Sequence, residues 1–103
     1  MDFSNITVGL KGTATECVVQ DNTAQAMGSG SLPVYATPAM TCLMEKAAAE
    51  LLEKLVPAGW TTVGISLDVK HKAPTPVGPG VRAEAEVTAV EGRKVTFSVH
   101  AFD

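Results

Sequence analysis

The stretch Ala36-Thr37-Pro38-Ala39-Met40-Thr41-Cys42-Leu43-Met44-Glu45 decides the fold, because it begins the one long helix that the sequence predicts. Thr37 is expected to cap this helix, and Pro38 suits the first helical position, where its missing N–H costs no hydrogen bond. Apolar residues then recur at the i, i+3, i+4 spacing of one helical face as far as Leu55. They are Met40, Leu43, Met44, Ala47, Ala48, Leu51, Leu52 and Leu55. Glu45 lies at the margin of this stripe, where a helix resting on a sheet can present a carboxylate to a cleft.

Length and composition narrow the class of protein. A chain of 103 residues forms one small domain, residues 1–103, with a single core. The net charge of −3 and the lack of a basic run argue against a nucleic-acid partner. No apolar run is long enough to span a membrane, and no signal peptide is recognisable. Cys17 and Cys42 fall on different predicted elements, so we expect buried free thiols and a reducing, cytoplasmic location.

One strand and one short helix are predicted before the long helix. The strand covers residues 12–19, and Asp21 is expected to cap a short helical segment that ends at Met27. The loop Gly28-Ser29-Gly30-Ser31 then runs into the start of the long helix. It is therefore placed to act as a flap over a site at that point.

Three strands are predicted after the helix, which ends near Val56-Pro57-Ala58-Gly59. Alternation of apolar and polar residues assigns strands to residues 61–70, 81–90 and 94–102, the last two joined by a tight hairpin. In the first strand Val63, Ile65, Leu67 and Val69 share the face directed at the helix, and His71 continues their parity. One long helix on an antiparallel sheet buries one apolar stripe against one face, so we predict an α+β fold.

Three separated pieces of the chain resemble hotdog-fold acyl-CoA thioesterases, in particular the subgroup that includes fluoroacetyl-CoA thioesterase. The pieces are residues 32–40, 43–45 and 67–78, and the resemblance extends from about residue 12 to the end. Their spacing also matches, with eight residues from Thr37 to Glu45 and twenty-six from Glu45 to His71. The resemblance implies a hotdog fold, in which an antiparallel sheet wraps around one long central helix, and a site at a dimer interface.

The same resemblance implies a catalytic trio of Thr37, Glu45 and His71, with the backbone N–H of Gly64 polarising the substrate carbonyl. Glu45 would serve as nucleophile or as general base, and His71 would hold or deprotonate Thr37 or protonate the departing thiolate. Each residue also has a structural explanation. Capping accounts for Thr37, a solvated helix edge for Glu45, and a satisfied buried histidine for His71.

The sequence departs from this subgroup at two places. The aromatic lid residues of the fluoroacetyl-CoA specialist would fall at Gly28 and Ser31, which carry no ring, so that substrate is not supported. The chain also ends at Asp103, where such proteins usually add one more strand.

Helix geometry constrains how the trio could work. Eight helical residues advance about 12 Å along the axis, so Thr37 and Glu45 of one straight helix cannot both touch one carbonyl. We therefore expect either a site that combines residues from two chains or a displaced helix start. A two-fold dimer would carry two equivalent composite sites, and such dimers could pair into tetramers.

The function that these observations favour is hydrolysis of a small or medium acyl-CoA, with CoA as part of the substrate and no further cofactor. No Cys/His cluster has the spacing of metal ligands. The expected substrate contacts are Tyr35, Lys70, Lys72 and Arg82, the last three as cations for the CoA phosphates. Two alternatives stay open. One is a non-catalytic acyl- or CoA-binding hotdog module, and the other is a hotdog hydratase, although Asp68 should point away from His71.

Overall fold

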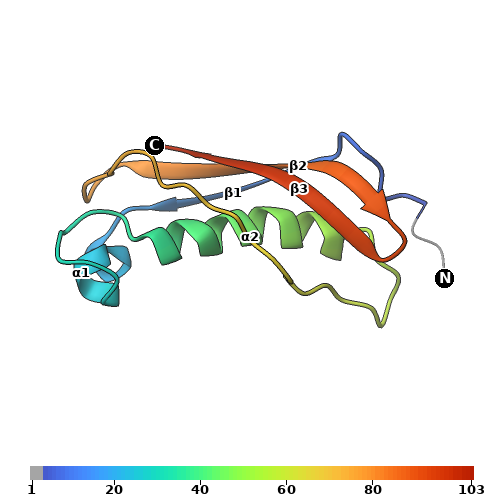
Figure 1. Ribbon diagram of the computed structural model, residues 1–103, viewed down its shortest axis with the longest axis horizontal. Helices are drawn as coiled ribbons and strands as arrows, with labels where there is room; N and C mark the ends of the chain where they lie inside the picture. Colours follow the sequence, from blue (N-terminus) through green and yellow to red (C-terminus); the bar gives the residue numbers. More distant parts are fainter. Residues whose placement is uncertain (1–3) are drawn as a thin grey trace.

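The computed structural model describes residues 4–103, in which a three-stranded antiparallel sheet packs on one long helix (Figure 1). The elements in chain order are β1 (Lys11–Cys17), the 3-10 turn η1 (Gln20–Asn22), α1 (Ala24–Met27), α2 (Thr37–Glu53), β2 (Gly80–Glu91) and β3 (Lys94–Phe102). The strand order is β1-β2-β3, so β2 is the central strand. This architecture confirms the predicted α+β class and the single long helix.

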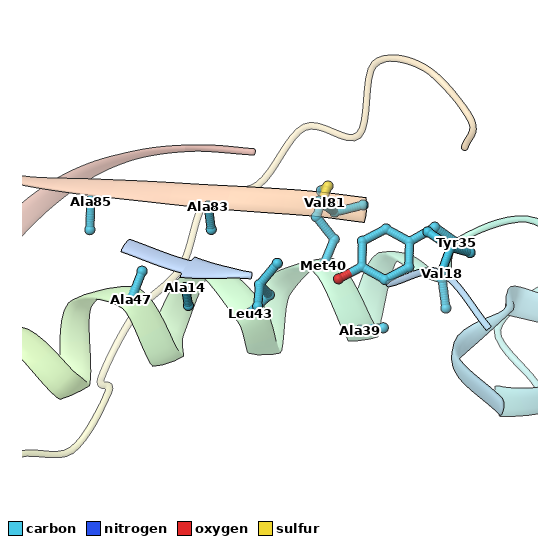
Figure 2. Packing of buried hydrophobic residues seen from close by; sticks show 11 residues of the cluster. Ala14, Val18, Tyr35, Ala39, Met40, Leu43, Ala47, Val81, Ala83 and Ala85 are labelled. Carbon is cyan, nitrogen blue, oxygen red and sulfur yellow. The ribbon is translucent and has the colours of Figure 1, made fainter. Parts of the chain in front are cut away.

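The core lies between α2 and the inner face of the sheet (Figure 2). The helix buries the stripe Ala39, Met40, Leu43, Ala47 and Leu52. Opposite it, the strands contribute mainly small side chains, namely Ala14, Val81, Ala83 and Ala85. A Cβ at Gly12 of β1 would lie only 2.5 Å from the carbonyl oxygen of Ala47, so this glycine permits the close approach of strand and helix.

The β2–β3 hairpin follows the predicted alternation as far as Val87, after which a register shift pairs Ala89 with Thr96 and so interrupts the alternation. Glu91 pairs with Lys94 across a two-residue loop, and Gly92 supplies the positive φ of 60° that this turn needs. On β3 the side chains that face inward are only half-buried, because α2 packs mainly on β1 and β2. They are Val95, Phe97, Val99 and Ala101. The edge strand β3 therefore keeps part of its apolar face uncovered.

Residues 61–70 do not form the predicted strand. They run as an irregular connection from the end of α2, past the helix, to the turn before β2 (Figure 1). Val63 is 81% exposed and Ile65 is 75% exposed, so neither packs on the helix. Alternation predicts which side chains share a face, but a strand also needs a neighbouring backbone for its hydrogen bonds. No strand within residues 4–103 pairs with this segment, so two strands follow α2 rather than three.

Two smaller predictions are also wrong. Thr23, not Asp21, caps the short helix α1, because the Thr23 hydroxyl accepts a hydrogen bond from the backbone N–H of Ala26 at 3.2 Å. Both cysteines are free but exposed rather than buried. Cys17 alternates with the inward-facing residues of β1, and Cys42 lies off the buried stripe of α2.

Candidate active site

A groove of about 1010 Å³ lies beside α2, between β3 and the connection that replaces the predicted strand. The helix contributes Met44, Glu45 and Ala48, and the apolar inner side chains of β3 line the opposite side. Gly64, His71 and Lys72 belong to the connection and line the groove as well. The groove therefore combines an apolar lining with carboxylates and imidazoles, among them those of Glu45 and His71.

Thr37 and His71 form a hydrogen-bonded pair at the start of α2. The Thr37 Oγ1 atom lies 2.8 Å from His71 Nδ1, although 34 residues separate the two in sequence. Ala36 is the N-cap residue and no side chain caps the helix, so the prediction that Thr37 is the cap is wrong. Thr37 is instead the first helical residue, from which its hydroxyl reaches His71 rather than the backbone of the next turn. Capping therefore does not account for this threonine.

The direction of the Thr37–His71 hydrogen bond depends on the imidazole tautomer. When the proton is on Nε2, the Thr37 hydroxyl donates to Nδ1, and when it is on Nδ1, that N–H donates to the hydroxyl. His71 is half-buried and Thr37 is exposed, so the pair is anchored on one side and accessible on the other. Such a pair can move a proton between the hydroxyl and a substrate.

Glu45 and Gly64 form a second close pair, farther along the helix. The Glu45 carboxylate lies so close to Gly64 that a Cβ on Gly64 would be 2.6 Å from Glu45 Oε2. Glu45 is exposed in the single chain and has no ion pair within residues 4–103. A carboxylate that forms no ion pair can act as a nucleophile or as a base.

The two pairs lie apart from each other on the same helix. Helix α2 runs unbroken from Thr37 to Glu53, so the helix start is not displaced. Thr37 and Glu45 are therefore separated by about 12 Å along the helix axis. The structure brings Thr37 to His71 and Glu45 to Gly64, but it does not bring all four residues of one chain to one point.

The residues predicted to contact the substrate differ in whether they can reach the groove. Lys72 is exposed and lines the groove, as does Lys70. Arg82 does not line it, because its neighbours along β2 face the core and Arg82 therefore points to the outer face, where it pairs with Glu84 at 2.5 Å. Tyr35 is 2% exposed, and its hydroxyl donates a hydrogen bond to the Glu16 carboxylate, so this hydroxyl is already occupied. The pKa of Tyr35 is raised above its ordinary value, mainly because the phenol is buried and secondly because it is hydrogen-bonded to the Glu16 carboxylate.

One feature at the groove was not predicted from the sequence. The guanidinium of Arg93, in the β2–β3 turn, lies 4.9 Å from the ring centroid of Trp60, which follows the end of α2. Both residues line the groove, where they add a cation and an aromatic surface. No local sequence pattern links them, because only the fold brings the hairpin to the end of the helix.

Comparisons with known proteins agree with this fold. Residues 18–103 match the family described as FlK: Fluoroacetyl-CoA-specific thioesterase. The fluoroacetyl-CoA thioesterase of Streptantibioticus cattleyicolor is 37% identical over 70 residues, which cover 68% of this chain and 50% of that protein. The chain thus spans about half the length of this curated relative.

Solved structures extend the similarity to nearly all of the chain. A mutant of the fluoroacetyl-CoA-specific thioesterase FlK in complex with fluoroacetate and CoA has a TM-score of 0.88 and 30% identity, covering 95% of this chain and 83% of its own. A hot-dog-like protein from Thermanaerovibrio acidaminovorans has a TM-score of 0.86 and 28% identity, covering 98% of this chain and 76% of its own. These similarities confirm the predicted hotdog fold.

Within residues 4–103 no helix is long and apolar enough to cross a membrane.

Proposed function

The chain belongs to the family of fluoroacetyl-CoA-specific thioesterases, and on this basis we propose that it hydrolyses the thioester of a small or medium acyl-CoA. The observation that best supports the proposal is the hydrogen bond between Thr37 and His71, because capping no longer explains that threonine. The proposed substrate carries its own CoA group, and no further cofactor is included. We expect the protein to act in the cytoplasm, where free thiols such as Cys17 and Cys42 stay reduced.

In the proposed reaction Glu45 either attacks the thioester carbonyl or removes a proton from the attacking water. The carbonyl oxygen gains negative charge, which the backbone N–H of Gly64 stabilises by a hydrogen bond. The carbon–sulfur bond then breaks, and the imidazolium form of His71 gives a proton to the CoA thiolate while Thr37 holds the ring in place. Water then returns a proton to His71, and Glu45 releases to water any proton that it took up, so that the products are the free acid and CoA. When Glu45 attacks, water afterwards hydrolyses the acyl anhydride and restores the carboxylate.

The substrate that we propose is not fluoroacetyl-CoA itself. The family resemblance implies that the aromatic lid residues of that specialist would fall at Gly28 and Ser31, and neither of these residues has a ring. The groove has a mainly apolar lining, to which Met44, Ala48 and Phe97 contribute. An unsubstituted acyl chain would bury its methylene groups there, each contributing about 0.8 kcal/mol.

The direct test is the release of CoA from a series of acyl-CoA esters of increasing chain length, followed with a thiol reagent. Glu45→Gln keeps the size of the side chain and removes its charge, so we expect kcat to fall about 100-fold or more with an unchanged melting temperature. The matched control is Glu50→Gln on the same helix, where the carboxylate only forms an exposed pair with Lys46 at 3.9 Å. Full activity of Glu45→Gln would refute the mechanism. Binding of CoA esters without hydrolysis by the wild type would favour the binding module instead.

We further propose that the complete site combines two chains of a homodimer, with Thr37 and His71 from one and Glu45 and Gly64 from the other. Support comes from the separation of about 12 Å between the two pairs within one chain. Thr37→Ala and Glu45→Gln, each inactive alone, can be unfolded together and refolded as a mixture. Half of the dimers then contain both variants and each has one intact site, so about a quarter of the wild-type activity should return. No recovery despite dimer formation would contradict a composite site.

A further inference from the structure

Tyr35 is a buried polar residue that takes no part in the proposed chemistry. Its side chain is 2% exposed and packs in the core near Val18 and Met40 (Figure 2). Its hydroxyl donates a hydrogen bond to the carboxylate of Glu16 on β1. Because burial and then this carboxylate raise the pKa of Tyr35 above its ordinary value, the phenol stays protonated and remains a donor at any working pH.

The backbone of Tyr35 connects the two segments that carry Thr37 and His71. Tyr35 lies two residues before Thr37, and its N–H donates to the carbonyl of Thr75 at 2.7 Å. Thr75 in turn lies four residues after His71. The side chain of Tyr35 ties this junction to β1, so one residue joins the sheet, the helix start and the connection that carries His71.

His71 has few other attachments. The connection over residues 61–72 forms no ladder with any strand of the described chain, and its backbone is therefore not held by the sheet. The contacts that place His71 relative to α2 include the hydrogen bond to Thr37, the packing of Val69 against the core, and the junction around Thr75, where Val34 and Pro76 form a bridge. A hydrogen bond of 2.8 Å between two side chains tolerates little displacement of either backbone.

We propose that Tyr35 and Glu16 are positioning residues, whose hydrogen bond fixes the helix start so that the Thr37 hydroxyl meets His71 Nδ1. Tyr35 lines the groove, but neither residue takes part in the bond-breaking steps proposed above. The inference rests on the proposed function only for its kinetic consequence, because the Thr37–His71 geometry can be measured without a substrate. A displacement of about 1 Å at such a pair can lower the rate about 100-fold.

The test compares Tyr35→Phe, which keeps the ring and removes only the hydroxyl, with Glu16→Gln, whose amide oxygen still accepts a hydrogen bond. We expect Tyr35→Phe to lower kcat about tenfold or more with KM within twofold, and Glu16→Gln to retain most of the activity. In Tyr35→Phe the ¹⁵N chemical shift of His71 Nδ1 should move toward that of Thr37→Val, in which the hydrogen bond is absent. Val87→Ala is the control for stability alone, because Val87 is fully buried in β2 and does not line the groove.

The outcomes separate the two proposals. One outcome is that Val87→Ala lowers the melting temperature as much as Tyr35→Phe and still leaves kcat and the His71 Nδ1 signal unchanged. The loss of kcat in Tyr35→Phe then comes from the displaced Thr37–His71 pair and not from lower stability. If Tyr35→Phe leaves the His71 Nδ1 signal unchanged, the positioning inference is wrong, whatever happens to kcat. If the wild type hydrolyses no acyl-CoA, the proposed function fails, and the His71 signal alone still decides the inference. Should Tyr35→Phe not fold, Glu16→Leu removes the same hydrogen bond and is measured in its place.

Discussion

Replacing Gly64 by alanine should disable the site without unfolding the protein. The added Cβ would lie 2.6 Å from Glu45 Oε2, whereas ordinary contact begins at 3.4 Å, so the carboxylate must move by at least 3.4 − 2.6 = 0.8 Å. The obstructing atom is the end of a flexible side chain, and Gly64 does not have a positive φ. Moving the carboxylate therefore costs little, and the reduced freedom of the unfolded chain contributes about 0.4–1 kcal/mol to stability.

The matched variant is Gly12→Ala, in which the new Cβ would meet the backbone carbonyl oxygen of Ala47 at 2.5 Å. That oxygen cannot move without shifting α2, so we expect this variant to lose about 1–3 kcal/mol of stability. Thermal unfolding and CoA-release kinetics on both proteins make the comparison. Gly64→Ala should keep its melting temperature and lose about 10- to 100-fold in kcat, whereas Gly12→Ala should lower the melting temperature. Normal kcat in Gly64→Ala would show that the position of the Glu45 carboxylate is irrelevant to catalysis.

Three further predictions follow from the described contacts. Thr37→Ala should change the free energy of unfolding by less than about 0.5 kcal/mol, whereas Thr23→Ala should lower it by about 1 kcal/mol, because of these two threonines only Thr23 caps a helix. Chemical denaturation measures both changes, and equal losses would contradict the assignment of Thr23 rather than Thr37 as a helix cap. Tyr35 is the only tyrosine, so absorbance at ultraviolet wavelengths follows its ionisation alone. Because its pKa in the folded state is raised, its contribution to stability is full below its ordinary pKa of about 10 and is lost as the pH rises above that value. A phenol that titrates near 10 in the folded protein would refute its burial. Lys72→Ala should raise KM for acyl-CoA a few-fold while Arg82→Ala leaves it unchanged, since Lys72 lines the groove and Arg82 does not. The opposite result would place the CoA phosphates on the outer sheet face.

Local sequence patterns were sufficient to predict the elements whose backbone hydrogen bonds join residues that are close in sequence. The apolar spacing from Met40 to Leu55 predicts α2, which ends slightly earlier, at Glu53, and alternation with a glycine turn predicts the β2–β3 hairpin. The pairing of Thr37 with His71 was expected only from the family resemblance, since the local pattern around Thr37 favours a cap. The structure shows that Ala36 occupies the cap position and leaves the hydroxyl available.

Long-range partners account for the predictions that failed. Residues 61–70 have the alternation of a strand, but a ladder depends on a neighbouring backbone that the sequence of the segment itself does not contain. The Arg93–Trp60 contact, which no local pattern indicated, likewise depends on where the hairpin lies relative to the helix. The carboxylate of Glu45 was placed correctly at the edge of the apolar stripe, but its contact with Gly64 needed the fold.

The free edge of β3 and the exposed side chains of Val63 and Ile65 have a consequence for work with this chain in solution. Unpaired N–H and C=O groups beside bare aliphatic surface form a template on which other polypeptides can stack. Unless something covers that surface, the purified chain should become turbid as it is concentrated or warmed. Lysine in place of Ile65 should raise its solubility limit, since a charge at such a border discourages intermolecular stacking.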